Sequence, residues 1–139
     1  MKSISPYLTF NGKTEEAFTF YQSVFGGEPR IDRYKDLEDP MGAAGDDLNK
    51  IANVELKIDA NITLYGSDLI SGSHQPLIEG NNISLHLEIE SEEKTEALFS
   101  KLSNGGTVTM PLMDTGWAKM FGMCNDKFGI NWMVYYPGE

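Results

Sequence analysis

The strongest constraint on the fold is a pattern of helix-terminus signals that occurs twice along the chain. In the first copy, Thr14-Glu15-Glu16 precedes a run of apolar residues at helical spacing, and Gly26-Gly27 ends that run. In the second copy, Ser91-Glu92-Glu93 takes the first place and Gly105-Gly106 the last. Hydroxyl side chains cap helix N-termini, glutamates suit the first turn, and glycine ends helices. The pattern therefore predicts a duplicated structural unit.

Each copy predicts one amphipathic helix, over residues 14–25 and over residues 92–103. Asn11 and Thr14 are the candidate N-caps of the first helix, and Ser91 is that of the second. Apolar residues at helical spacing predict the face of each helix that packs on a sheet. They are Ala17, Phe18, Tyr21, Val24 and Phe25 in the first helix, and Ala97, Leu98 and Leu102 in the second.

Alternating apolar and polar residues predict strands before and after each helix. The alternation is clearest in IANVELKI and NISLHLEIE, which occupy residues 51–58 and 82–90. The full set of expected strands is 7–10, 31–35, 51–58, 62–65, 82–90, 107–110, 117–123 and 130–136. The expected order is therefore β-α-β-β-β, twice.

A tight turn is predicted just before the last strand, in the sequence CNDKFGINWMVYY. The Asp126 side chain can accept hydrogen bonds from its own turn, and Gly129 can adopt the positive φ that such turns need. In the strand that follows, one face is expected to pack under a helix and the other to face away from it. The face expected to pack under the helix is formed by Trp132 and Val134. The opposite face is formed by Asn131, Met133 and Tyr135.

The predicted fold class is α+β, with two modules that each place one helix on a four-stranded mixed sheet. Such a sheet has one covered face and one bare face. Two of these sheets placed edge to edge would curl into a trough lined by the bare faces. We expect a single domain over residues 1–139, with modules over about 1–70 and 80–139.

Two stretches resemble a known protein family. They are PYLTFNGKTEEAFTFYQSVFGGE near the start and WAKMFGMCNDKFGINWMV near the end. Both resemble the PhnB-like branch of the vicinal oxygen chelate superfamily, which includes glyoxalases, extradiol dioxygenases and bleomycin- or fosfomycin-resistance proteins. Lys127 departs from the pattern, because the branch has proline there. The resemblance spans the chain and implies the glyoxalase/bleomycin resistance fold.

Metal-dependent members of this superfamily hold a divalent ion with His and Glu side chains. The resemblance places Pro6, Leu64 or Tyr65, Ser84 and Met133 at the ligand positions. Proline and leucine offer no donor atom, and the other side chains are poor ligands for such ions. Some PhnB-like relatives also carry a histidine where this chain has Asn53. We therefore predict no superfamily-type metal site and no cofactor.

The predicted ligand-binding residues are those expected to face the trough. They are Glu55, Ser84, His86, Trp117, Phe121, Asn131, Met133 and Tyr135. His86 and Glu88 share a strand face, so they can act as general acid and base, or contribute to a non-standard metal site. The alternative is a solvated polar strand face or a subunit interface. Trp117 and Phe121 either line the ligand site or belong to the core.

Two further residues have alternative interpretations. His74 lies in a Ser/Gly-rich loop, which can be read as a phosphate site although no basic residue or helix N-terminus follows it. Cys124 is either a small buried residue or a nucleophile, and no histidine is near it in the sequence.

The charge balance excludes several partner classes. The 139 residues carry a net charge of −10, and no basic patch is visible, so nucleic acid and anionic membrane surfaces are not expected partners. A single cysteine, with no long apolar segment, predicts a cytoplasmic protein. Exposed sheet edges need covering, so we expect a homodimer.

The function predicted from these features is small-molecule binding without metal. The alternative is a glyoxalase- or dioxygenase-like enzyme, metal-assisted or acid–base, acting on a small metabolite. PhnB-like proteins are sometimes labelled demethylubiquinone methyltransferases. The chain has no G-x-G-x-x-G motif, and its glycine pairs follow the helices rather than precede them, so we do not expect that activity.

Overall fold

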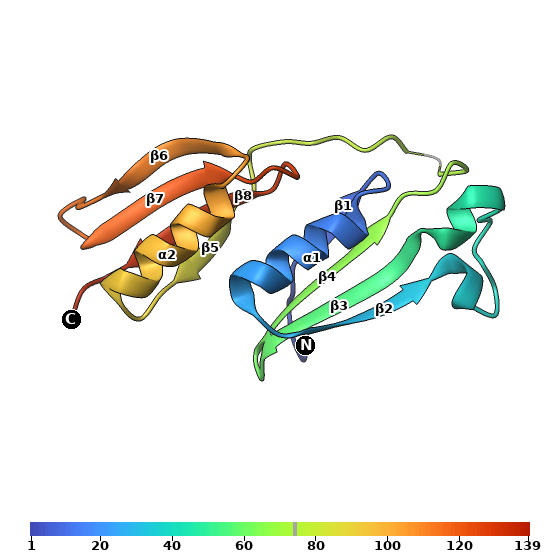
Figure 1. Ribbon diagram of the computed structural model, residues 1–139, viewed down its shortest axis with the longest axis horizontal. Coiled ribbons are helices and arrows are strands. Elements are labelled where there is room, and N and C mark those ends of the chain that lie inside the picture. The colour runs from blue at the N-terminus through green and yellow to red at the C-terminus, as the bar shows by residue number, and fades with distance from the viewer. Residues whose placement is uncertain (74) are drawn as a thin grey trace. The chain divides into compact units, whose positions relative to one another are not determined.

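The computed structural model describes residues 1–73 and 75–139, and these form two compact units, Met1–Ile78 and Glu79–Glu139 (Figure 1). Unit 1 contains β1 (Tyr7–Phe10), α1 (Thr14–Phe25), β2 (Glu28–Arg33), the short 3-10 helices η1 (Tyr34–Asp36) and η2 (Gly45–Asn49), β3 (Ile51–Asp59) and β4 (Ile62–Asp68). Unit 2 contains β5 (Leu85–Glu88), α2 (Glu92–Ser103), β6 (Thr107–Met113), β7 (Met120–Asn125) and β8 (Asn131–Tyr136). The predicted α+β class, the β-α-β-β-β order of both halves and both helix ranges are confirmed.

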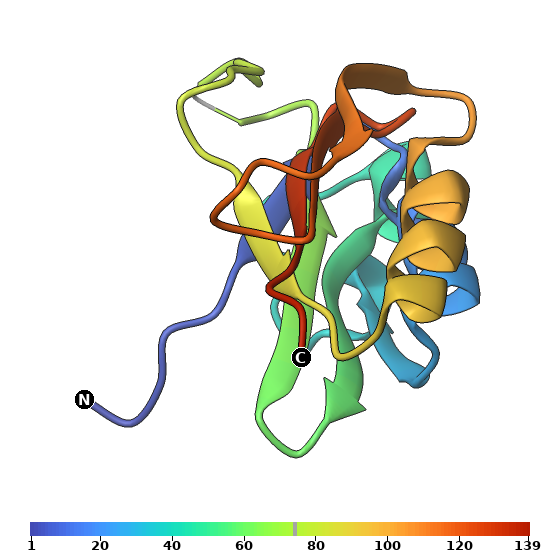
Figure 2. The same ribbon diagram turned by 90° about the vertical axis from the view of Figure 1, so that its left-hand side faces the viewer.

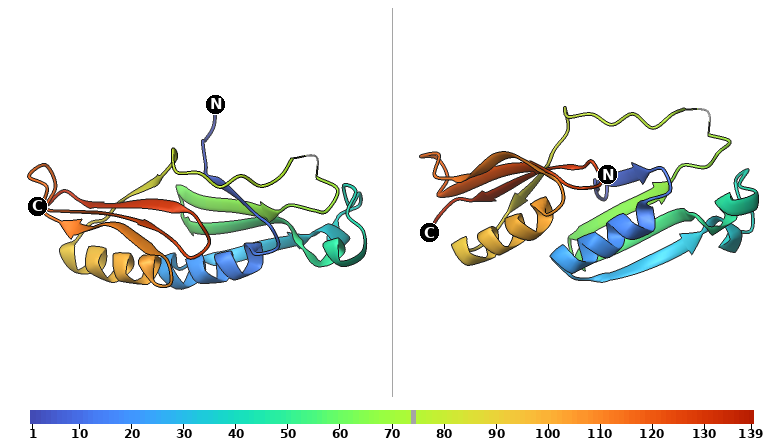
Figure 3. Two further views of the ribbon diagram at one scale, coloured as in Figure 1. Left: turned by 90° about the horizontal axis from the view of Figure 1, so that it is seen from above. Right: turned by 45° about the horizontal axis from the view of Figure 1, so that its top comes forward.

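Each unit has a four-stranded mixed sheet with the same topology. The strand orders are β1-β4-β3-β2 and β5-β8-β7-β6. In each sheet the first pair is parallel and the other two pairs are antiparallel. Each helix lies along one side of its own sheet (Figure 3). The other face of each sheet is therefore not covered by the helix of its unit.

The core of unit 1 lies between α1 and its sheet. Ala17, Phe18 and Tyr21 are buried on the helix side, as predicted, and Val54 and Leu56 are buried on β3. Val24 and Phe25 are only half-buried, because they lie in the last turn of the helix. The helix approaches the sheet so closely that a Cβ added at Gly66 would lie 2.6 Å from Phe18 Cε2.

The N-terminus of α1 is capped by a residue from the far end of unit 1. The Asp68 carboxylate, which is 4% exposed, accepts hydrogen bonds from Thr14 N at 3.1 Å and from Thr14 Oγ1 at 2.6 Å. Its second oxygen accepts one from Ile51 N at 3.0 Å. The prediction that Asn11 or Thr14 caps this helix is wrong, because a buried carboxylate satisfies the free N–H group and the Thr14 hydroxyl together.

In unit 2, α2 begins at the predicted cap, since Ser91 Oγ accepts a hydrogen bond from Lys94 N at 3.2 Å. Its buried face differs from the predicted one. Thr95, Phe99 and Leu102 are buried, whereas Ala97 is exposed. Thr95 tolerates burial because its hydroxyl donates to Ser91 O at 2.6 Å. A prediction based only on apolar residues at helical spacing leaves out such a threonine, although its hydroxyl is hydrogen-bonded to the preceding turn of the helix.

The two Gly-Gly pairs serve the same two structural purposes in both units. The first glycine of each pair, Gly26 or Gly105, has a φ of +80°. The second passes against a strand backbone. A Cβ would lie 2.5 Å from Lys57 O at Gly27 and 2.2 Å from Asn125 O at Gly106. Both copies therefore have a positive-φ glycine just after the helix and a second glycine where the backbones approach closely.

The C-terminal turn forms as predicted. Asp126 Oδ1 accepts hydrogen bonds from Phe128 N at 2.8 Å and Ile130 N at 3.1 Å, and Gly129 has a φ of +94°. Asp126 Oδ2 also accepts a hydrogen bond from Trp132 Nε1 at 2.8 Å. The turn therefore fixes the buried indole at the start of β8.

Several strand boundaries differ from the predicted ones. The strand expected over 31–35 is β2, which begins and ends earlier, and the strand expected over 117–123 is β7, which begins at Met120. Trp117 lies in a turn before β7 instead, which is described below. β5 covers only Leu85–Glu88 of the predicted 82–90. Within the described residues, no helix combines the length and apolar character needed to cross a membrane.

Candidate functional site

The helix-free face of the unit 2 sheet carries most of the predicted site residues. Along β8, Trp132, Val134 and Tyr136 are buried. Asn131, Met133 and Tyr135 alternate with them and so lie on the opposite face. Figure 2 shows unit 2 from another side, with α2 lying beside one face of its sheet. The strand alternation expected for β8 is therefore present.

Strand register shows which residues are neighbours on this face. On β5, His86 is opposite Met133 and Glu88 is opposite Tyr135. On β7, Phe121 is opposite Tyr135, and Met123 is opposite Met133. Cross-strand partners share a face of the sheet. On β6, Met110 is opposite Met123 and Met113 is opposite Phe121, with a shift in register before and after Met110.

Four rings form a continuous group on this face, which we call the aromatic cluster: His86, Trp117, Phe121 and Tyr135. The ring centroids of Trp117 and Phe121 are 4.9 Å apart, and those of Trp117 and Tyr135 are 5.9 Å apart. The His86 and Tyr135 centroids are 5.3 Å apart. Trp117 is nevertheless 62% exposed, whereas Phe121 is buried. The cluster therefore has a buried base and an exposed indole.

A short turn holds Trp117 in this position. Gly116 N donates to Asp114 Oδ1 at 2.8 Å, and Gly116 has a φ of +87°. Thr115 N donates to Ala118 O at 3.1 Å, and Ala118 N donates to Thr115 Oγ1 at 3.2 Å. Ala118 is buried, so the turn is anchored next to Trp117. The sequence predicted a strand here, and the Asp-Thr-Gly run was the signal for a turn instead.

Two other predicted site residues, Asn131 and Ser84, lie at or just before the start of a strand. Asn131 Nδ2 donates to Gly80 O at 2.9 Å and to Ile83 O at 3.1 Å, and its Oδ1 accepts a hydrogen bond from Asn125 Nδ2 at 3.0 Å. Its amide therefore holds the segment before β5 against β8. Ser84 is half-buried and lies just before β5, rather than within the strand.

Glu55 is the one predicted site residue that lies in unit 1. On the helix-free face of that sheet, Glu55 is opposite Arg30 on one side and Tyr65 on the other. Tyr65 and Tyr7 are register partners, and their rings are stacked with centroids 6.4 Å apart and planes 5° apart. Unit 1 therefore has its own pair of aromatic rings on the face where Glu55 lies.

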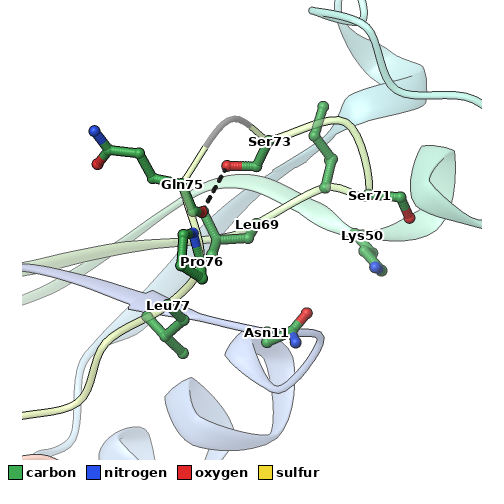
Figure 4. Close-up of a pocket in the computed structure, with 9 residues that line it drawn as sticks. Asn11, Lys50, Leu69, Ser71, Ser73, Gln75, Pro76 and Leu77 are labelled. Carbon is green, nitrogen blue, oxygen red and sulfur yellow. Dashed lines mark hydrogen bonds between the residues drawn. The ribbon is translucent and has the colours of Figure 1, made fainter.

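Unit 1 also has a pocket that the sequence did not predict (Figure 4). The pocket encloses about 650 Å³ and is lined by Asn11, Lys50, Leu69, Ile70, Ser71, Ser73, Gln75, Pro76 and Leu77. Lys50 Nζ lies 2.8 Å from Asp47 Oδ1, so its charge is already paired. That pairing disfavours an anion here. His74, the residue behind the phosphate hypothesis, lies outside the described residues.

Asp47 is the most strongly perturbed carboxyl group beside this pocket. The hydrogen bond from Lys50, together with one from Ser71 N at 2.9 Å, lowers the pKa of Asp47 to about 2. The same pair raises the pKa of Lys50. The only sequence feature that pointed to this pocket is the Ser/Gly/Pro-rich loop after β4, which lines part of it.

The positions that the resemblance assigns to the superfamily metal ligands are Pro6, Leu64 or Tyr65, Ser84 and Met133. Leu64 is buried and offers no donor atom, and Pro6 offers none either. Met133 has a soft thioether on the helix-free face of unit 2. Within residues 1–73 and 75–139, no group of three or more His, Cys, Asp and Glu side chains is placed to hold a metal ion.

Cys124 belongs to the core. It is 2% exposed and opposite Trp132 in the sheet register. Burial, with a smaller contribution from the nearby Asp126 carboxylate, raises the pKa of the Cys124 thiol to about 11. The thiolate form is therefore scarce at neutral pH, which favours the interpretation of Cys124 as a small buried residue.

Comparison with known proteins identifies relatives along the whole chain. Protein YjdN of Escherichia coli K12 is 28% identical over 137 residues, which cover 94% of this chain and 92% of that protein. Protein PA1353 of Pseudomonas aeruginosa has a crystal structure with a TM-score of 0.88 and 34% identity, covering 100% of both chains. A Bacillus cereus PhnB protein, titled a putative 3-demethylubiquinone-9 3-methyltransferase, is 25% identical with a TM-score of 0.74, covering 97% of this chain and 99% of that one.

More distant structures share only the fold. A glyoxylase/bleomycin resistance protein/dioxygenase domain from Frankia has a TM-score of 0.66 at 13% identity, covering 100% of this chain and 94% of that one. The family described as 3-demethylubiquinone-9 3-methyltransferase matches residues 2–135. The chain therefore belongs to that family, as its similarity to the PhnB protein of Bacillus cereus also indicates, and it has the glyoxalase/bleomycin resistance fold.

Proposed function

We propose that this protein binds a small molecule on the helix-free face of the unit 2 sheet, without a superfamily-type metal ion. The observation that carries the proposal is the exposed Trp117 ring, which lies against Phe121 and Tyr135 and is held by its own turn. Aromatic side chains with few polar groups are the usual lining of small-molecule sites. An exposed indole of fixed orientation offers a ligand a ring to stack on at little conformational cost.

The methionines beside the aromatic cluster support the same proposal. Met123 and Met133 are cross-strand neighbours, Met110 of β6 is opposite Met123, and Met113 is opposite Phe121. Thioether side chains are flexible and polarisable, so they adapt to ligands of different shapes. Such a surface suits a protein that sequesters a ligand.

The alternative function is an enzyme on the same scaffold. His86 and Glu88 are exposed neighbours on β5, so they can exchange protons with a ligand on this face. The name of the matching family is that of a methyltransferase. We do not propose that activity, because the chain lacks the Gly-rich loop between a strand and a helix that nucleotide-type cofactors use.

The proposal can be tested by a thermal-shift screen of neutral and cationic small molecules. A ligand that binds only the folded protein raises Tm, and the rise grows with the ratio of ligand concentration to Kd. We expect hits whose stabilisation is lost in Trp117→Ala, while the unliganded Tm stays close to that of the parent because Trp117 is largely exposed.

The matched control is Leu77→Ala, which changes the unit 1 pocket instead. Hits that survive Trp117→Ala but disappear in Leu77→Ala would refute the proposed site and move it to that pocket. Metal analysis of the purified protein addresses the second half of the proposal. Stoichiometric Zn, Ni, Mn or Fe would favour the enzyme alternative, if a chelator removes the metal and also abolishes turnover of a ligand found in the screen.

A further inference from the structure

One carboxylate dominates the charge of the unit 2 sheet. The strands β5, β6, β7 and β8 are described in full, and in them Glu88 is the only Asp, Glu, Lys or Arg residue. The helix-free face of this sheet therefore carries one carboxylate and the His86 imidazole, with no Lys or Arg from its own strands. Glu88 is therefore the only acidic side chain that these strands offer to a ligand on this face.

Glu88 lies beside the aromatic cluster. It is opposite Tyr135 in the parallel β5–β8 pair, and the Tyr135 ring is stacked with the exposed Trp117 ring. Glu88 is itself exposed, and in the described part of the chain no Lys or Arg forms an ion pair with it. The carboxylate is thus available to a ligand that rests on these rings.

The corresponding face of unit 1 has a different charge pattern. There Glu28 is opposite Lys57 and Arg30 is opposite Glu55, so charges of both signs alternate across the strands. Opposite charges on neighbouring strands compensate one another. The two modules therefore share a topology but differ in charge, since the strands of unit 2 place a carboxylate on this face without a Lys or Arg opposite it.

These observations point to the class of ligand, given the proposed function on which the inference rests. We infer that the unit 2 face binds an organic ammonium ion, with its cationic head over the Trp117 ring and its charge balanced by Glu88. Aromatic faces attract quaternary ammonium groups, and tryptophan does so most strongly. The net charge of −10 adds a long-range attraction for cations and repels anions.

The test compares choline with 3,3-dimethylbutan-1-ol, its neutral carbon isostere, at matched ionic strength. Binding is followed by NMR through the two indole N–H signals of the protein. The Trp117 signal reports the site, and the signal of Trp132 is an internal reference because that indole is buried and bonded to Asp126. A Trp117→Phe variant assigns the two signals.

We expect choline to shift the Trp117 signal and to bind about 2- to 30-fold more tightly than the neutral isostere, the range of a cation–π contact. Glu88→Gln should remove most of this preference. Glu96→Gln is the matched control, because it changes the net charge equally on the exposed surface of α2 and should leave the preference intact.

The other outcomes separate the two proposals. If both probes shift the Trp117 signal with equal affinity and Glu88→Gln has no effect, the cation inference is overturned and the small-molecule site stands. If neither probe nor any thermal-shift hit moves the Trp117 signal, both the inference and the proposed site are refuted. If Glu96→Gln lowers the preference as much as Glu88→Gln, only net charge is responsible, and the specific role of Glu88 is refuted.

Discussion

Replacement of Asp68 tests how unit 1 is held together. Its carboxylate accepts three hydrogen bonds from buried donors, two from Thr14 and one from Ile51 N. Asp68→Ala leaves these three donors without their acceptor. Each buried unsatisfied donor costs about 1–3 kcal/mol, so the expected loss in the free energy of unfolding is about 3–6 kcal/mol after partial relaxation. That loss is a large share of the total stability of a typical domain.

Asp68→Asn provides a graded comparison. The amide keeps one oxygen as acceptor but turns an N–H₂ group toward either Thr14 or Ile51, so it should cost about 1–3 kcal/mol. Asp39→Ala is the control, because Asp39 also accepts a backbone hydrogen bond, from Met41 N at 3.0 Å, but at the exposed surface. Its expected cost is below about 1 kcal/mol.

Urea unfolding followed by circular dichroism measures all three variants against the parent protein. We expect the order of destabilisation to be Asp68→Ala, then Asp68→Asn, then Asp39→Ala, with an unchanged m-value. Equal effects of Asp68→Ala and Asp39→Ala would refute the reasoning, since they would mean that the buried position of Asp68 adds nothing to its role as a cap.

Four further predictions follow from single features. Met133→Trp should abolish ligand-induced thermal shifts while the fold persists, whereas Leu87→Trp should lower stability by about 1–3 kcal/mol through overpacking; the reverse result would mean that the two strand faces are exchanged. The folded pKa of Asp47 is lower than its ordinary value of 3.8, so its pairing with Lys50 should stabilise the protein above pH 4 and be lost as the pH falls toward 2; Asp47→Asn should flatten that part of a pH–stability curve. The Cys124 thiol should resist a thiol reagent at pH 7.5 in native protein and react at once in denaturant, and rapid native labelling would contradict its burial. Light scattering should give a homodimer of the 15.5 kDa chain, and a monomeric mass across a wide concentration range would rule this out.

The sequence alone determined the features that depend on neighbouring residues. Both helix ranges, the Ser91 cap and the Asp126 turn were predicted, because each depends on residues within a few positions of one another. Strand alternation also assigned Trp132 and Val134 to the buried face of β8. The family followed from the same local motifs taken together, with matches along residues 2–135.

Which distant residues become partners depends on tertiary packing. The cap of α1 comes from Asp68, which is 54 positions away from Thr14, and no local rule connects the two. The exposed Trp117 joins Tyr135 because a turn and a sheet register bring them together. The unit 1 pocket likewise combines Asn11 and Lys50 with residues that follow β4. Periodicity determines the face on which a side chain lies, but its partner across space depends on the packing of the whole unit, which a sequence pattern does not encode locally.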